Sequence, residues 1–157
     1  MKTPFPPIKQ TLLWLCILAM AVGVAAYAYS GTFTRLWADD SCYSSTVQQY
    51  GLLQGIGVWY QTSGSRFSAL PVVALTDLFG VWGVRLFPAF VLGLWVLAGT
   101  LLLRAVARAC RWQLARGWAL FFGLLLTFFA AYLAPDPLQT IYWRMGIIHY
   151  SLPAPIF

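Results

Sequence analysis

The chain has 157 residues, of which 61% are hydrophobic, 17% are aromatic and only 9% are charged. This composition, with a mean hydropathy of +0.73, excludes an ordinary soluble domain and indicates an integral membrane protein. The net charge of +6 does not indicate nucleic acid as a partner, because the ten Lys and Arg residues are scattered between apolar runs instead of gathering on one polar face.

The first membrane span is predicted at residues 11–30, after a polar lead that contains three prolines. These 20 residues carry no charge and would measure about 30 Å as a helix, which matches the hydrocarbon core of a bilayer. The alternative is a cleavable signal peptide, with Lys2 and Lys9 as its basic region and Ala26-Tyr27-Ala28 as its cleavage site. We favour a retained span because the apolar run is long for a signal peptide and further spans follow.

Residues 31–80 form a long loop, and an acidic pair, Asp39 and Asp40, lies near its start. From Asp40 onward, Tyr43, Val47 and Tyr50 recur at helical spacing with polar residues between them. This pattern predicts a short amphipathic helix on the membrane surface, capped by one of the two aspartates. The glycines at positions 51, 55 and 57 are expected to loosen the chain, and a turn is predicted at 62–65.

Two further spans are predicted at residues 81–103 and 118–134, joined by an arginine-rich connection. The apolar run at 67–79 has only 13 residues, about 20 Å as a helix, and it contains Pro71 and Asp77. We therefore predict an interfacial or re-entrant piece there. Small-residue pairs at 19 and 23 and at 89 and 93 indicate close helix contacts.

Residues 138–150 mix aromatic side chains with Arg144 and His149, which predicts an aromatic interfacial segment and not a span. Residues 151–157 look like the beginning of another apolar element. The predicted fold is therefore all-α: one membrane domain over 1–157, a polytopic transmembrane helix bundle with about three spans and interfacial helices in the outer loop. The apolar end predicts that the chain is the N-terminal fragment of a longer protein.

The charges predict the orientation in the membrane. Six basic residues would share one side of the bilayer: Lys2, Lys9, Arg104, Arg108, Arg111 and Arg116. The other four arginines and all four acids would share the opposite side. The positive-inside rule then makes the N-terminus cytoplasmic and the 31–80 loop external. Cys16 would lie in a span, Cys42 outside and Cys110 inside, so no intrachain disulfide is expected.

Asp39 and Asp40 are the first candidates for chemistry. Paired carboxylates can act as a general base or hold a divalent cation, which is the one cofactor that this sequence suggests. The alternative is that they only cap a helix, where an acid is stabilised by about 0.3 to 1 kcal/mol. Arg66 follows a turn on the same side and could bind a phosphate or pair with these acids, and the alternative is a snorkelling membrane anchor.

Four residues near the end of the chain are the candidates for substrate binding: Tyr142, Trp143, His149 and Tyr150. Aromatic rings can stack on a sugar and the histidine can relay a proton, but we favour the alternative that Tyr142 and Trp143 belong to the aromatic belt of a membrane protein and that His149 is an ordinary interfacial residue. The sequence has no Gly-rich phosphate loop, no HExxH motif and no nucleophile elbow, so nothing in it supports a soluble-type NTPase, a zinc protease or a hydrolase.

Several of these features together resemble the N-terminal part of the GT-C type membrane glycosyltransferases, especially bacterial multi-pass members. They are the first span, Asp39-Asp40 at the start of a long outer loop, the turn at 63–67, and the 142–153 stretch. The resemblance implies transfer of a sugar from a polyprenyl-phosphate carrier to an extracytoplasmic acceptor. It implies that Asp39 or Asp40 is the catalytic base or organises a metal, and that Arg66 faces the carrier phosphate.

Two departures from that family matter. Ser65 is an extra residue in the turn, and the family's core module has more spans than the three predicted here, so this chain alone is expected to lack a complete carrier site. The expected partners are membrane lipid, the lipid-linked sugar, and either missing C-terminal spans or a partner subunit, in a bacterial inner membrane. The alternative functions are a non-catalytic multi-pass membrane protein and a transporter or flippase-type subunit.

Overall fold

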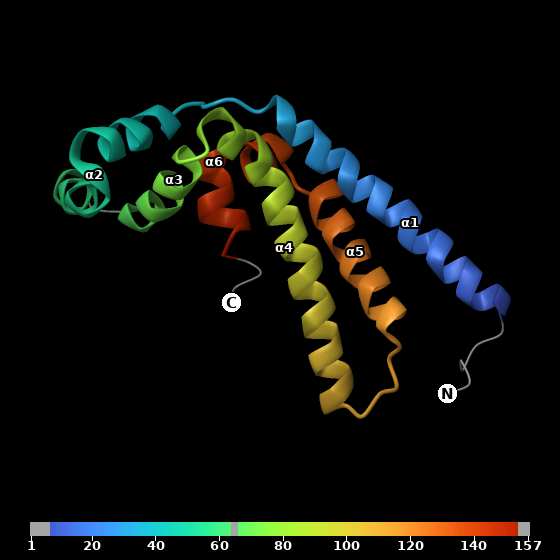
Figure 1. Cartoon of the computed structure of the whole chain (residues 1–157). Helices are drawn as coiled ribbons and strands as arrows, with labels where there is room; N and C mark the ends of the chain where they lie inside the picture. Colours follow the sequence, from blue (N-terminus) through green and yellow to red (C-terminus); the bar gives the residue numbers. More distant parts are fainter. Residues whose placement is uncertain (1–6, 64–65, 154–157) are drawn as a thin grey trace.

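The fold is known from a computed structural model, which describes residues 7–63 and 66–153 (Figure 1). Over these residues the structure is all-helical and contains no strand, which confirms the predicted all-α class. Three long helices form a bundle: α1 (Pro7–Ser30), α4 (Gly80–Ala109) and α5 (Arg116–Tyr132). The remaining helices, which are short except for α2, gather at one end of it: η1 (Gly31–Phe33), α2 (Asp40–Ser63), η2 (Phe67–Ala69), α3 (Leu70–Asp77), η3 (Leu138–Tyr142), α6 (Arg144–Gly146) and η4 (Ile147–Ser151).

Two of the bundle helices, α1 with η1 and α4, are long and apolar enough to cross a membrane. The sequence predicted three spans, and the third, α5, has only 17 residues because it begins at Arg116 and ends before Pro135-Asp136-Pro137. Many apolar side chains of these helices are exposed, including Leu12, Trp14 and Leu18 on α1. Two candidate spans are therefore what the described residues provide.

The bundle is held together by an apolar core and by one close backbone approach. Ile17 and Val24 of α1 pack in the same cluster as Leu92 of α4 and Leu124 of α5. A Cβ at Gly123 would lie 3.0 Å from both the Thr100 nitrogen and the Val96 carbonyl oxygen, so α5 meets α4 where only glycine fits. Of the predicted small-residue contacts, Gly23 does lie against Phe128, whereas Gly93 has no neighbouring atom within 4 Å.

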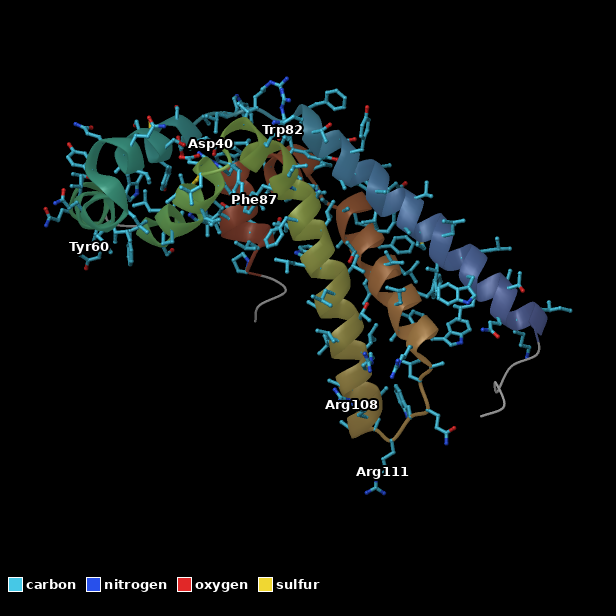
Figure 2. The ribbon with its side chains drawn as sticks, in the orientation of Figure 1. Asp40, Tyr60, Trp82, Phe87, Arg108 and Arg111 are labelled. Carbon is cyan, nitrogen blue, oxygen red and sulfur yellow. The ribbon has the colours of Figure 1, made fainter. Side chains whose placement is uncertain are left out.

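The ends of the bundle differ in charge. Figure 1 shows α4 running toward the end that carries the start of α1 and the α4–α5 connection, and α5 running away from it. Arg108 and Arg111 lie at this end, and Asp40 lies at the opposite one (Figure 2). The short helices therefore form a separate layer at the end that carries the acidic residues.

This layer has its own core, which includes Tyr43, Leu70, Phe87 and Met145. α2 is longer than the predicted helix, and it is broken at Gly51, where φ is 72° and ψ is 176°. Gly51 thus loosens the chain as predicted, but positions 55 and 57 continue the helix. The predicted apolar piece at 67–79 forms η2 and α3, which are too short to span, as expected.

The 138–150 segment, predicted as an interfacial stretch, folds into η3, α6 and most of η4. Its residues 144–148 are buried in the core of this layer, where the Arg144 side chain has its partners. The predicted apolar beginning at 151–157 falls mostly outside the described residues, as do residues 64 and 65 of the predicted turn.

Candidate functional site

A single buried arginine organises the layer of short helices. Arg144 opens α6 and is 1% exposed. One terminal nitrogen, Nη1, donates to Asp77 Oδ1 at 2.6 Å and to Thr76 Oγ1 at 3.3 Å. The other, Nη2, donates to Ser44 Oγ at 2.7 Å and to the Asp40 carbonyl oxygen at 2.9 Å. We call Asp40, Ser44, Thr76, Asp77 and Arg144 the Arg144 network.

Asp40 is completely buried, and both oxygens of its carboxylate are in use. Oδ2 accepts a hydrogen bond from the Trp37 amide at 3.0 Å, and Oδ1 accepts one from the Met145 amide at 3.2 Å. Arg144 Nε lies 3.6 Å from Oδ1. Burial raises the pKa of Asp40, and the Trp37 amide, the Arg144 charge and the Met145 amide oppose that rise.

The network ties α2, α3 and α6 together through charged groups that sit out of water. Its two carboxylates and one guanidinium leave one negative charge in excess, and Asp77, whose side chain is 21% exposed, is the member that keeps contact with the surroundings. Removing one partner from a buried ion pair typically costs about 3 to 5 kcal/mol, because the remaining charge is left unpaired. The network therefore fixes the relative positions of these three helices.

Asp39 lies next to Asp40 but has the opposite environment. It is exposed, and its carbonyl oxygen accepts hydrogen bonds from the amides of Cys42 and Tyr43 in the first turn of α2. Ala38, the residue before it, has a φ of 47°, in the left-handed region that alanine rarely adopts. The tight turn buries one aspartate and leaves the other facing outward, so the two members of the predicted pair cannot do the same chemistry.

Tyr43 is a residue of this site that the sequence analysis did not single out. Its ring is buried against Trp59, with centroids 4.0 Å apart. Burial raises the pKa of Tyr43; the positive charge of Arg66 lowers it and the negative charge of Asp39 raises it. The charges of Arg66 and Asp39 therefore act on the same phenol in opposite directions. Arg66 is exposed and directly precedes η2, with a φ of 65°.

The four predicted substrate-binding residues are spread over different surroundings. Trp143 donates through Nε1 to the Trp37 carbonyl oxygen at 3.2 Å and packs edge-on against the Trp37 ring, so it contacts the turn that holds the acidic pair. Tyr142 donates to the Tyr27 carbonyl oxygen at 3.3 Å, away from that turn. The structure brings only Trp143 to the predicted acidic site.

The remaining two lie in η4. His149 Nδ1 lies 2.6 Å from the Met145 carbonyl oxygen, so Nδ1 carries the proton, and the buried Nε2 has no hydrogen-bond partner among the described residues. Tyr150 is exposed and lines a cleft of about 300 Å³ between α4, α5 and η4. Neither residue contacts the Arg144 network through its side chain.

The residues present do not fit a resident divalent cation at Asp39 and Asp40. Both Asp40 oxygens accept N–H groups, and within residues 7–63 and 66–153 no three His, Cys, Asp or Glu side chains come together. Divalent cations such as Mg²⁺ and Ca²⁺ take several oxygen ligands, and here only Asp39 has its carboxylate exposed.

The sequence did not identify four residues of this site, because their partners lie 67 to 104 positions away in the chain. They are Ser44, Thr76, Asp77 and Arg144. A signal was present: Asp77 and Arg144 each interrupt an apolar or aromatic run, and a charge in such a run requires a partner.

Comparison of the chain with protein-family models, curated proteins and solved structures finds no match.

Proposed function

We propose that this chain is an integral membrane protein whose three long helices cross the bilayer, with α5 as a short third span. The exposed apolar side chains of α1 and α4 support this, because lipid is the environment in which such surfaces are stable. The charge difference between the ends supports a cytoplasmic start of α1 and an external layer of short helices. A bacterial inner membrane is the proposed location.

We further propose that the external layer carries a lipid-linked sugar transferase site of GT-C type, of which this chain supplies the first part. The observation that carries this proposal is the difference in environment between the two aspartates of the acidic pair. Asp40 is held in the Arg144 network, while Asp39, the residue before it, is exposed in the same external layer as the exposed Arg66. A general base must be accessible and held by a rigid support, and Asp39 meets both conditions, while the exposed Arg66 supplies a cation in the same layer.

In this mechanism the hydroxyl oxygen of the acceptor attacks the anomeric carbon of the sugar, and Asp39 takes the proton from that hydroxyl. The bond between that carbon and the carrier phosphate breaks, and the electron pair leaves with the polyprenyl phosphate. Arg66 binds the phosphate and stabilises the charge that develops on it. Asp40 positions Asp39 and does not touch the substrate.

The experiment compares Asp39→Asn with Asp40→Asn in the complete reading frame that contains this chain, with transfer from a polyprenyl-phosphate-linked sugar as the assay. Asp39→Asn should lower the transfer rate by about a hundred- to ten-thousand-fold at unchanged stability, since a general base contributes that much. Asp40→Asn should lower the unfolding temperature as well. Asp136→Asn removes a carboxylate from the same side and serves as the control.

A non-catalytic membrane protein is the second candidate function. The observation that favours it is that every contact of the Asp40 carboxylate is made with the protein itself. A folded Asp39→Asn protein that transfers sugar at the wild-type rate would contradict the transferase proposal and support this one.

A further inference from the structure

An apolar groove runs between α3 and α4 at the external end of the bundle. We call it the α3–α4 groove; its walls include Leu75, Phe79, Trp82, Leu86, Phe90 and Leu152, and its volume is about 480 Å³. The helices touch at its floor, where Gly83 lies directly against the Thr76 carbonyl oxygen. Thr76 is the single polar side chain among the lining residues, and its hydroxyl already donates to the Val73 carbonyl oxygen.

The walls of the groove are large apolar side chains that nothing in the described part of the chain covers. Phe79 and Trp82 are 67% and 61% exposed, and Leu75, Leu86 and Phe90 are each more than half exposed. The size of the groove lies within the range of small-molecule sites. A hydrocarbon chain would remove this surface from contact with polar surroundings.

Arg85 stands beside this groove and lacks an anionic partner. Its guanidinium carbon lies 5.5 Å from the centre of the Trp82 ring, which forms a groove wall. Its Nε is buried and donates to no acceptor in the described residues. Of the four acids, Asp40 and Asp77 contact Arg144, Asp136 accepts from the Leu138 amide, and the exposed Asp39 forms no ion pair with Arg85. A guanidinium without an anion in the described part of the protein, at the end of a membrane helix, favours an anionic group from outside the chain.

We propose that Arg85 and the α3–α4 groove bind one anionic phospholipid of the outer leaflet. Its phosphodiester accepts hydrogen bonds from the Arg85 guanidinium, and one acyl chain lies in the groove, with Trp82 between headgroup and chain. Arg85 needs an anion, and the adjoining groove needs an apolar group to cover it. A single molecule supplies both only if it joins an anion to a hydrocarbon chain. The site needs α4 to lie in a bilayer but does not depend on transferase activity.

The test is quenching of Trp82 fluorescence by brominated lipids in micelles of the purified full chain. The Trp82→Phe protein is measured in parallel, and the difference isolates Trp82 from the other tryptophans. Brominated phosphatidylglycerol should quench this component at about fivefold lower lipid fraction than brominated phosphatidylcholine, since one basic residue at a membrane surface favours anionic lipid by about that factor.

Two variants at position 85 and two controls make the result specific. Arg85→Gln should remove the preference for phosphatidylglycerol, and Arg85→Lys, which keeps the charge, should retain most of it. Arg35→Gln removes an exposed arginine from the same end and should leave the preference unchanged. Leu86→Gln should weaken quenching by both lipids. Equal quenching by the two lipids in the wild type, a preference that survives Arg85→Gln, or equal losses in Arg35→Gln and Arg85→Gln would each overturn the proposal.

Discussion

Two neighbouring aspartates with opposite environments are the most informative residues of this protein. The sequence placed Asp39 and Asp40 together and could not divide their roles, because a pair of carboxylates at a helix start suits both chemistry and capping. What separates them is Arg144, more than a hundred positions away, which only the folded chain brings to Asp40. The cost of burying a charge predicts that such a partner exists but does not identify it.

The Arg144→Gln variant tests how much the Arg144 network contributes to the stability of the protein. The change leaves Asp40 and Asp77 without their cation, so the free energy of unfolding should fall by about 3 to 5 kcal/mol. Arg66→Gln removes an exposed arginine from the same layer and should change it by less than about 0.5 kcal/mol. Thermal unfolding in detergent, followed by near-ultraviolet circular dichroism, gives both values. Equal unfolding temperatures for the two variants would show that the buried ion pairs of Arg144 do not stabilise the folded protein.

At the scale of the helices, the predicted elements lie close to the observed ones. Periodicity and length locate helices of this size well, and α1, α4 and α5 begin or end within a few residues of the predicted spans. The sequence predicted only some of the places where the helices touch, such as Gly23, which lies against Phe128. Gly93 was predicted to make a close contact, but the close contact is made by Gly123. The prediction failed because small residues recur often in apolar helices, and their spacing alone does not identify the residue that faces another helix.

Gly123→Ala should lower the stability of the bundle, because its Cβ would meet the backbone of α4 at Thr100 and Val96. Overpacking of this kind costs about 1 to 3 kcal/mol. The matched control is Gly93→Ala, in open space on α4, which should be neutral or stabilising. Unfolding temperatures of the two variants in the same detergent decide the matter, and a stable Gly123→Ala protein would exclude this close contact.

The break in α2 makes a similar prediction with its own control. Gly51 has a φ of 72° and a ψ of 176°, a conformation that is essentially restricted to glycine and costs other residues about 1 to 3 kcal/mol. Gly51→Ala should therefore destabilise the external layer. Gly57→Ala, in an exposed part of the same helix with no atom within 4 Å, should not. If both variants unfold at the wild-type temperature, α2 is not held in the bent form.

For the whole molecule, composition and charge distribution predict a membrane protein with its acidic end outside. The structure provides two helices that could span, and it places Arg108 and Arg111 at one end of the bundle and Asp40 at the other (Figure 2). Three spans were predicted from apolar runs alone, and α5 is shorter than the others because charged and proline-rich segments bound it closely. The orientation rests on the charges, since a helix bundle by itself has no inside or outside.

The most direct measurement uses two cysteines that the chain already has. Cys42 follows the Asp39-Asp40 turn, Cys110 ends α4, and both are exposed. In cells that express single-cysteine proteins, a membrane-impermeant maleimide should label Cys42 in intact cells and Cys110 only after permeabilisation. Labelling of Cys110 but not Cys42 in intact cells would place the acidic pair on the cytoplasmic side and contradict an external transferase site.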